Sequence, residues 1–220
     1  MYGLVILCIC QLLVISSAQC PGGQTTADQC VQKCGSTECR CNASRTNTSS
    51  YSNCVQSCEP PDCDGDGKMT CNADGNCTQT CKPGYCDMDC DALQYCTQHG
   101  DENGLERMKC SAKKCIQTCQ GGECKRMRCE GENCHQTCSR GGCIMNCTQS
   151  VDYCVQRCTA HADCTLDCRA KTCVQSCVGP KNCKILNSGR VYRVNGNFLA
   201  FLLVFVFINL KCGWIWTNYA

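Results

Sequence analysis

The sequence predicts an all-β, disulfide-stapled protein with little regular structure, in which repeats of two short strands stack as a small β-solenoid. Three observations lead to this prediction. The chain of 220 residues contains 33 cysteines, far above the roughly 8–10% that marks a disulfide scaffold. The pattern Cys-x-Gln-x-Cys recurs at a spacing close to 19 residues, which indicates a repeat architecture. Four Phe and two Trp are too few for an ordinary aromatic core, so we expect covalent bridges to replace much of the missing burial.

Residues 1–18 are expected to form a signal peptide. An apolar run from Leu4 to Ile15 is followed by small residues up to Ala18, the pattern at which a signal peptidase cuts. About 12 apolar residues are too few for a membrane-spanning helix, which needs roughly 20. Cleavage after Ala18 would send the chain along the secretory route, where the environment is oxidising and disulfides persist.

The cysteine repeats are divided into looser units in residues 19–76 and a regular array in residues 77–187. Cysteines four residues apart share one face of a strand or of a helix, but the central Gln joins that face only in a strand. The residues that flank Gln are mostly Val, Ile or Thr, which suit a pleated surface. The strand is therefore favoured, with helical hairpins as the alternative. Full copies of the pattern begin at Cys30, Cys54, Cys77, Cys115, Cys134, Cys154 and Cys173, and a variant begins at Cys96.

The second segment of each unit is also predicted to be a strand. Met88, Met145 and Leu166 each stand midway between two cysteines, which gives an inner row of cysteine, apolar residue and cysteine. Connecting segments such as 82–85 and 139–142 are rich in Gly and Pro, as tight turns require. Independent hairpins on a string are one possible packing of these units. Stacking is favoured by the regular spacing and would align a ladder of side-chain amides from Gln32, Gln56, Gln79, Gln98, Gln117, Gln136, Gln156 and Gln175.

The unit that begins at Cys96 indicates how the cysteines pair. It has Gly100 in place of the second cysteine and, counted back from Met108, Glu106 in place of the third, while Cys96 and Cys110 remain. The joint loss predicts a nested pattern in which the second cysteine bonds the third and the first bonds the fourth. The predicted pairs are Cys77–Cys90, Cys81–Cys86, Cys96–Cys110, Cys115–Cys129, Cys119–Cys124, Cys134–Cys147, Cys138–Cys143, Cys154–Cys168, Cys158–Cys164 and Cys177–Cys183.

The nested pattern leaves two cysteines over. Cys20 and Cys173 have no partner in it, and they stand at opposite ends of the array. Either they form a disulfide between molecules, or the pairing near the ends of the array is rearranged.

An acidic loop is the candidate metal site. Asp62, Asp64 and Asp66 stand at alternate positions before Gly67, as in the start of a calcium-binding loop. The twelfth position is Ala73 and not the Glu that completes such loops, so an acidic insertion without calcium is the other interpretation. Cys63 within this loop is expected to bond Cys58. No other cofactor is expected, because closely spaced cysteines of the kind that bind soft metals occur only at Cys39 and Cys41 in the array.

Four asparagines stand in N-glycosylation sequons, at Asn42, Asn47, Asn76 and Asn146. The segment 188–220 contains a second apolar run, from Phe198 to Ile208, which follows a polar spacer and small residues. This order predicts a lipid-anchor signal with Asn187 or Ser188 as the anchored residue. A polar stretch follows the run, which is unusual for such signals, so a short spanning helix and a retained tail remain alternatives.

The composition bounds the function. A net charge of +2 with acids and bases mixed gives no reason to expect a nucleic-acid partner. The three histidines lie in different units, and no nucleophile–base set is apparent, so we do not expect an enzyme. A precursor of defence peptides is disfavoured because dibasic sites do not recur between the units; Lys113-Lys114 is the one such pair at a boundary between units. A structural extracellular protein is the first expectation. The alternative is an adhesive or receptor-like module that binds through outward residues such as Val31, Thr78, Ile116, His135 and Val155.

The signal peptide, the Cys-x-Gln-x-Cys repeats and the acidic loop at 62–67 together resemble repetitive cysteine-rich proteins of invertebrate extracellular and mineralised matrices, such as coral skeletal matrix proteins. The resemblance is compositional and covers residues 30–187. It implies secretion to the outside of the cell or its plasma membrane, and partners in the extracellular or skeletal matrix. It assigns no residue to that role.

Overall fold

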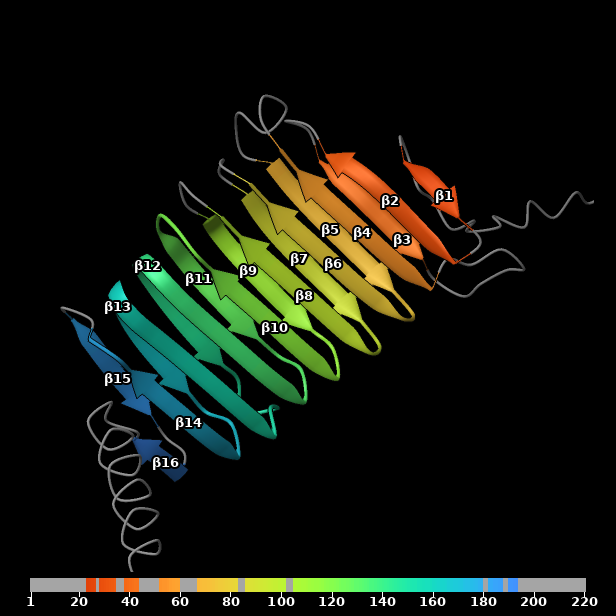
Figure 1. Ribbon diagram of the computed structural model, residues 1–220. Helices are drawn as coiled ribbons and strands as arrows, with labels where there is room; N and C mark the ends of the chain where they lie inside the picture. The colour runs from red at the N-terminus through yellow and green to blue at the C-terminus, as the bar shows by residue number, and fades with distance from the viewer. Residues whose placement is uncertain are drawn as a thin grey trace, which may run out of the picture.

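The computed structural model is an all-β, disulfide-stapled β-solenoid, as predicted (Figure 1). It describes residues 23–26, 28–34, 38–43, 52–59, 67–82, 86–101, 105–179, 182–187 and 190–193. These residues contain strands and turns without a helix, so none of them belongs to a helix that could cross a membrane. The helical-hairpin alternative is therefore wrong for the repeat array.

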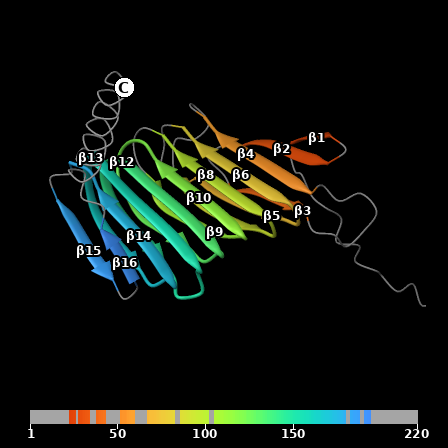
Figure 2. The same ribbon diagram turned by 60° about the horizontal axis from the view of Figure 1, so that its bottom comes forward.

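The strands form two layers that face each other, and neighbours within a layer are parallel except for β1 (Figures 1 and 2). The layer that carries the Cys-x-Gln-x-Cys segments, the glutamine layer, contains β1 (Gln24–Thr26), β2 (Gln29–Cys34), β4 (Asn53–Cys58), β6 (Asn76–Cys81), β8 (Tyr95–Gly100), β10 (Lys114–Cys119), β14 (Thr172–Cys177) and β16 (Arg190–Arg193). The opposite layer, the methionine layer, contains β3 (Cys39–Ala43), β5 (Gly67–Ala73), β7 (Cys86–Ala92), β9 (Leu105–Ser111), β11 (Cys124–Cys129) and β15 (Cys183–Asn187). Two long strands, β12 (Asn133–Cys147) and β13 (Tyr153–Cys168), run through both layers.

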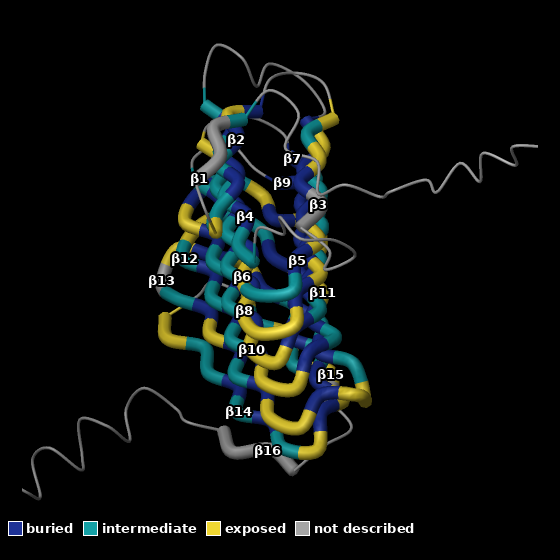
Figure 3. The backbone as a smooth tube through the Cα atoms, turned by 90° about the vertical axis from the view of Figure 1, so that its right-hand side faces the viewer, coloured by how far each residue is buried: buried dark blue, intermediate teal, exposed yellow. Residues whose placement is uncertain are grey.

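The register of the glutamine layer repeats without a shift from β2 to β10. Gln32 lies beside Gln56, which lies beside Gln79, and the same alignment continues to Gln117 and beyond to Gln175. Every second residue of these strands is buried, as the alternation of side chains in a strand requires. The eight glutamines thus face the interior, where each is at most 1% exposed. Buried residues alternate with less buried ones along the backbone of the strands (Figure 3). The units are therefore stacked, and they do not form independent hairpins.

The buried glutamines form a continuous, directional amide ladder. From Gln56 to Gln175, the Nε2 atom of each glutamine donates to the Oε1 atom of the glutamine one coil before it, at 2.7–2.9 Å. Most of the ladder's Nε2 atoms also donate across the interior to main-chain carbonyls of the methionine layer, for example Gln136 to Met127 at 2.9 Å. These hydrogen bonds satisfy polar groups that burial would otherwise leave unpaired, and they join the two layers.

The methionine layer fills the rest of the interior with unbranched or branched apolar side chains. Met69, Met88, Met108, Met127, Met145 and Leu166 lie beside one another in register and are fully buried. In the unit without its second and third cysteines, Leu105 and not Glu106 occupies the third cysteine position, because it aligns with Cys86 and Cys124. Glu106 points outward and is exposed. A Cβ atom on Gly100 would lie 1.8 Å from Leu105 Cδ1, so the leucine side chain fills the space of the missing disulfide.

Disulfides line both edges of the flattened coil in two columns. One column closes the turn within each coil by bonding the second cysteine to the third, as predicted. Its described members are Cys34–Cys39, Cys81–Cys86, Cys119–Cys124, Cys138–Cys143, Cys158–Cys164 and Cys177–Cys183. Cys58 is disulfide-bonded as well, but Cys63 lies outside the described residues.

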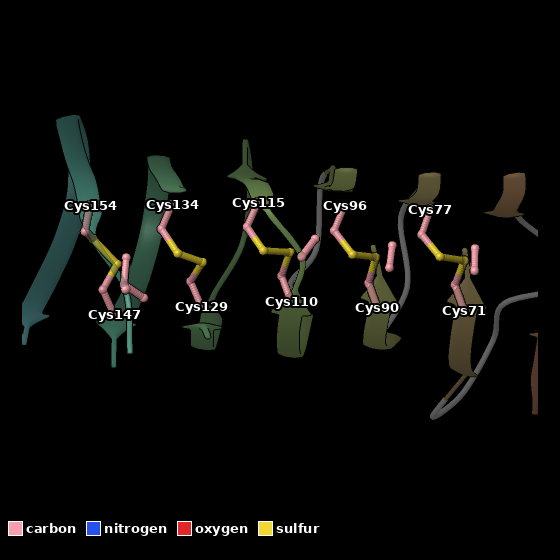
Figure 4. Close-up of a cluster of buried hydrophobic side chains, with 14 of the residues drawn as sticks. Cys71, Cys77, Cys90, Cys96, Cys110, Cys115, Cys129, Cys134, Cys147 and Cys154 are labelled. Carbon is pink, nitrogen blue, oxygen red and sulfur yellow. A yellow bond between two sulfur atoms is a disulfide. The ribbon is translucent and has the colours of Figure 1, made fainter. Parts of the chain in front are cut away.

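The other column differs from the prediction. The fourth cysteine of each coil bonds the first cysteine of the next coil, so the predicted pairs Cys77–Cys90, Cys96–Cys110, Cys115–Cys129, Cys134–Cys147 and Cys154–Cys168 are replaced. The observed members of this inter-coil column are Cys41–Cys54, Cys71–Cys77, Cys90–Cys96, Cys110–Cys115, Cys129–Cys134, Cys147–Cys154 and Cys168–Cys173. Figure 4 shows the pairs from Cys71–Cys77 to Cys147–Cys154. Cys173, predicted to be left over, is thus paired with Cys168, whereas Cys20 lies outside the described residues. The physical reason is that the turn from one coil to the next brings these cysteines to Cα separations of 6.0–6.5 Å, which a disulfide can span.

The two ends of the stack are built differently in the two layers. At the first end, β1 pairs antiparallel with β2, and at the last end β16 pairs with β14. In the methionine layer, β3 pairs with β5 alone and β15 pairs with β13 alone among the described strands. The glutamine layer therefore has an additional strand at each end, and the methionine layer does not.

Candidate functional surfaces

The outer face of the glutamine layer carries the aligned residues that the sequence singled out. Val31, Thr78, Ile116, His135 and Val155 lie in one row, because each stands directly after the first cysteine of its unit and the units are in register. Val55, Thr97 and Val174 complete the row. All of these side chains are half-buried by their neighbours on the sheet. The expected alignment of these outward residues is therefore confirmed.

A second row on the same face was missed by the sequence interpretation. Tyr95, Lys114, Asn133 and Tyr153 occupy equivalent positions, one residue before the first cysteine of successive units. We call these four residues the tyrosine row. Tyr95 is 49% exposed and Tyr153 is 39% exposed, so they are among the few large apolar side chains that reach the solvent. The register of the repeats, extended by one residue, would have found them.

The rings of the tyrosine row are flanked by nitrogen-bearing side chains. Lys114 Nζ lies 6.0 Å from the centroid of the Tyr95 ring, within the range of a cation–π contact. The rings of His135 and Tyr153 are tilted, with centroids 6.4 Å apart. Partial burial lowers the pKa of His135, and the nearby Lys114 lowers this pKa further. The face therefore presents aromatic, amide and cationic groups, with an imidazole that stays uncharged at neutral pH.

The outer face of the methionine layer is strongly charged and largely paired. Arg107 contacts Asp87 at 3.3 Å, and Arg128 contacts Glu130 at 2.6 Å. Three aspartates, Asp87, Asp89 and Asp91, alternate with buried residues along β7. Exposed pairs of this kind contribute about 1 kcal/mol or less each. The two faces of the stack thus differ in chemistry, one being weakly charged and β-branched and the other ionic.

The predicted modification sites fall in several environments. Asn76 is exposed at the start of β6, whereas Asn146 is partly buried and its Nδ2 atom donates to Asp167 Oδ2 at 2.7 Å. Asn42 lies in β3, and Asn47 lies outside the described residues. Asn187, one of the two predicted anchor positions, ends β15 and pairs with Cys168. Ser188 is outside the described residues, and a cut at either position would remove β16.

The candidate calcium ligands Asp62, Asp64 and Asp66 lie outside the described residues, so the structure places none of them. Two groups of three buried cysteines have sulfur atoms close enough together to suggest a metal site, namely Cys115, Cys129 and Cys134, and Cys119, Cys124 and Cys143. All six of these cysteines form disulfides, and a disulfide sulfur lacks the thiolate that binds metals. The oxidised clusters are therefore structural.

The basic spot formed by Lys125, Arg126 and Arg128 is partly neutralised. Lys125 Nζ contacts Glu106 Oε2 at 2.7 Å, and Arg128 contacts Glu130.

Comparison of the chain with protein-family models, with curated proteins and with solved structures finds no match. The functional interpretation therefore depends on the fold and on the surfaces described above.

Proposed function

We propose that this chain is a structural protein of the extracellular space, a short rigid rod that resists proteases. One observation supports it above the others: thirteen described disulfides staple the turns, and a buried amide ladder joins the stacked coils. Such an oxidised array suits an extracellular compartment. The dense covalent and hydrogen-bonded framework leaves few chain segments that a protease active site can accommodate, since cleavage requires local unfolding.

The test is limited proteolysis of the mature protein with trypsin, together with immunogold localisation in the tissue that expresses it. We expect the oxidised repeat array to survive as one disulfide-linked core, and the label to lie in the extracellular matrix. The matched control is the same protein after full reduction and alkylation, which should be digested completely. Rapid digestion of the oxidised protein, or a label confined to the cell interior, would remove the structural role.

An adhesive function is the second candidate, and the tyrosine row favours it. Exposed Tyr side chains supply large contact area with a polar tip and are enriched in binding sites. Adsorption to sensors coated with polysaccharide or with collagen would test it. The double variant Tyr95→Ser with Tyr153→Ser should adsorb less than the wild type, whereas Leu186→Ser, which removes an exposed apolar side chain from the other layer, should not. Equal adsorption of all three proteins would argue against adhesion through this face.

Calcium binding, the lipid anchor and N-glycosylation belong to the same proposal and have separate tests. Calcium titration of the wild type beside Asp64→Asn should show weaker binding by the variant, and equal affinity would remove the metal site.

Mass analysis of the C-terminus would show whether the chain ends in a lipid at Asn187 or Ser188. Treatment with a glycosidase that removes N-linked sugars should lower the mass if any of the four sequons is occupied.

A further inference from the structure

The inter-coil disulfides form a zigzag that brings one of its cysteines, Cys129, close to two potential partners. Cysteines of the two layers alternate along the column, so that Cys129 of the methionine layer lies between Cys134 and Cys115 of the glutamine layer (Figure 4). Cys129 is bonded to Cys134, and Cys115 is bonded to Cys110. The sulfur atoms of Cys115, Cys129 and Cys134 nevertheless all lie within 4.8 Å of one another. A second bond, Cys115–Cys129, is thus close at hand.

The same zigzag can be paired in two registers. In the observed register, the fourth cysteine of a coil bonds the first cysteine of the next coil, and Cys173 is paired with Cys168. If the pairing shifts by one cysteine, the first and fourth cysteines of the same coil are bonded, as in Cys115–Cys129, and Cys173 has no partner. The observed register is therefore the one that uses the last cysteine of the column, and the shifted register becomes available when one cysteine of the column is free.

We propose that the inter-coil column exchanges between these two registers through intramolecular thiol–disulfide exchange. The Cys129 thiol gives up one proton, which balances the proton that Cys110 later takes up, and the Cys129 thiolate attacks the Sγ atom of Cys115. The Cys115–Cys129 bond forms as the Cys110–Cys115 bond breaks, and Cys110 leaves as a thiolate that takes up a proton. One disulfide replaces another, so the step needs no oxidant or reductant once the first thiol exists.

The consequence is that a single reduced bond does not stay where it arose. Cys110, Cys115, Cys129 and Cys134 are all inaccessible to solvent, so a thiol inside the column meets its neighbouring disulfide before it meets a reagent from solution. Burial also disfavours the thiolate that reacts, so exchange is expected to be slow and to accelerate with pH. The inference concerns the disulfide column itself and holds whether the protein serves a matrix or an adhesive role.

The variant Cys134→Ala tests the proposal, because it leaves Cys129 without its partner. The purified variant is moved from pH 4 to pH 8, samples are returned to low pH at intervals and their thiols are alkylated in denaturant, and the disulfides are mapped by mass spectrometry. We expect a Cys115–Cys129 cross-link to appear together with an equivalent amount of alkylated Cys110. Alkylation that remains on Cys129 alone would overturn the proposal. Analysis at low protein concentration excludes exchange between molecules.

Two further variants keep the test decisive if one of them folds poorly. Cys110→Ala leaves Cys115 free, and its attack on Cys129 should give the same Cys115–Cys129 cross-link with Cys134 released. Cys154→Ala is the matched control, since it frees Cys147 in the same column, where Cys134, Cys147 and Cys154 do not form a group of comparable closeness. Formation of Cys134–Cys147 in this control should be several-fold slower. Equal rates in the control and in the first two variants would show that proximity of the three sulfurs does not direct the exchange.

Discussion

An inner glutamine of the ladder, such as Gln117, both satisfies its own amide and connects three chain segments. Gln117 Nε2 donates to Gln98 Oε1 at 2.8 Å and to the Arg128 carbonyl at 3.2 Å, while Gln117 Oε1 accepts from Gln136 at 2.7 Å. A buried polar group without a partner costs about 1–3 kcal/mol. A glutamine at this inner position is therefore stable only because the coils on both sides carry the same residue, which explains why the residue recurs in every unit.

We expect Gln117→Leu to lower the free energy of unfolding by about 3 kcal/mol, because it removes the Gln117 hydrogen bonds to Gln98 Oε1 and to the Arg128 carbonyl and the acceptor of the bond from Gln136. The measurement is guanidinium unfolding of the oxidised protein followed by circular dichroism. Gln175→Leu is the matched control at the end of the ladder. The Oε1 atom of Gln175 already has no hydrogen-bond partner in the described part of the chain, so its removal should cost about half as much. Equal losses would contradict a ladder in which inner members carry two neighbours.

Turns between the layers place their own demands on single residues, as Gly141 shows. This residue lies within β12 where the strand passes from one layer to the other, and its φ of 74° is in the left-handed region that favours glycine. A Cβ atom there would also lie 1.5 Å from the Gly122 carbonyl oxygen of the preceding coil. The stacking distance of the coils therefore leaves room for a hydrogen atom and for nothing larger.

The variant Gly141→Ala should lose about 3 kcal/mol or more of stability, because both the backbone conformation and the close approach oppose a side chain. The neighbouring Gly142→Ala gives the control, since its Cβ atom would meet only Glu123 Cγ, at an ordinary 3.8 Å. Thermal unfolding of the two oxidised variants beside the wild type provides the comparison. A similar midpoint for both alanine variants would show that the coil spacing relaxes easily.

At the scale of a coil, the unit that lacks its second and third cysteines indicates whether a disulfide could form at the two positions where those cysteines are missing. Gly100 aligns with Cys81 and Cys119, and Leu105 aligns with Cys86 and Cys124. The disulfides in those two neighbouring coils have Cα separations of 6.4 Å. At these two positions the backbone of the intervening coil aligns with both neighbours, so it should accommodate the same bond.

The double variant Gly100→Cys with Leu105→Cys should form the missing disulfide without reshuffling the others. The new bond closes a short loop and should stabilise the protein by about 2 kcal/mol relative to the reduced double variant. Mass spectrometry would show the loss of two hydrogens and a cross-link between the two substituted positions, and a thiol reagent should find no free sulfhydryl. Gly100→Ala alone should destabilise the protein by about 1–3 kcal/mol, because its Cβ atom displaces Leu105.

The local sequence pattern determines the strands, their inward face and their stacking, whereas the pairing of the inter-coil cysteines depends on the ends of the array. The Cys-x-Gln-x-Cys spacing predicted the strand, the inward Gln and the stacked register, because each follows from the alternation of side chains along a strand. The same spacing fits both pairings of the inter-coil column, and only the odd number of cysteines in the last unit distinguishes them. That unit contains only Cys173, Cys177 and Cys183. A bond from Cys173 to the preceding coil leaves none of the three without a partner, and the nested prediction overlooked this.

The prediction placed Glu106 at the third cysteine position, which Leu105 occupies, and this error also has a structural cause. Counting back from Met108 assumed a regular strand, whereas the pairing of β7 with β9 shifts register between Cys86 and Asp87. A bulge of this kind adds one residue to a strand, and no spacing rule within one unit predicts it. The tyrosine row was accessible from the sequence, since Tyr95 and Tyr153 stand at equivalent positions, but the interpretation compared only the residues between the cysteines.

At the scale of the whole molecule, the disulfides join residues that are close in the sequence, whereas the hydrogen bonds join residues of different coils. Most of the described disulfides join cysteines five to seven residues apart, so each one closes a turn and does not connect distant coils. Cohesion along the stack therefore comes from the parallel strand ladders and from the glutamine amides. In such an array each coil is stabilised by its two neighbours, and the coils at the ends have only one.

Hydrogen exchange of the oxidised protein should reflect this arrangement. We expect the slowest amide exchange in β10, β11 and β12, with protection falling toward β3 and β15, because those two strands each pair with one described neighbour and open at lower cost. Exchange followed by mass spectrometry of peptides, after reduction under quench conditions, resolves the coils. Gln117→Leu adds a directed perturbation, which should speed exchange in β8 and β12 and leave β2 and β14 unchanged. Equal protection along the whole stack, or a loss of protection in every coil of the variant, would mean that the solenoid opens as one unit, with its local disulfides transmitting stability over a longer range than their loops suggest.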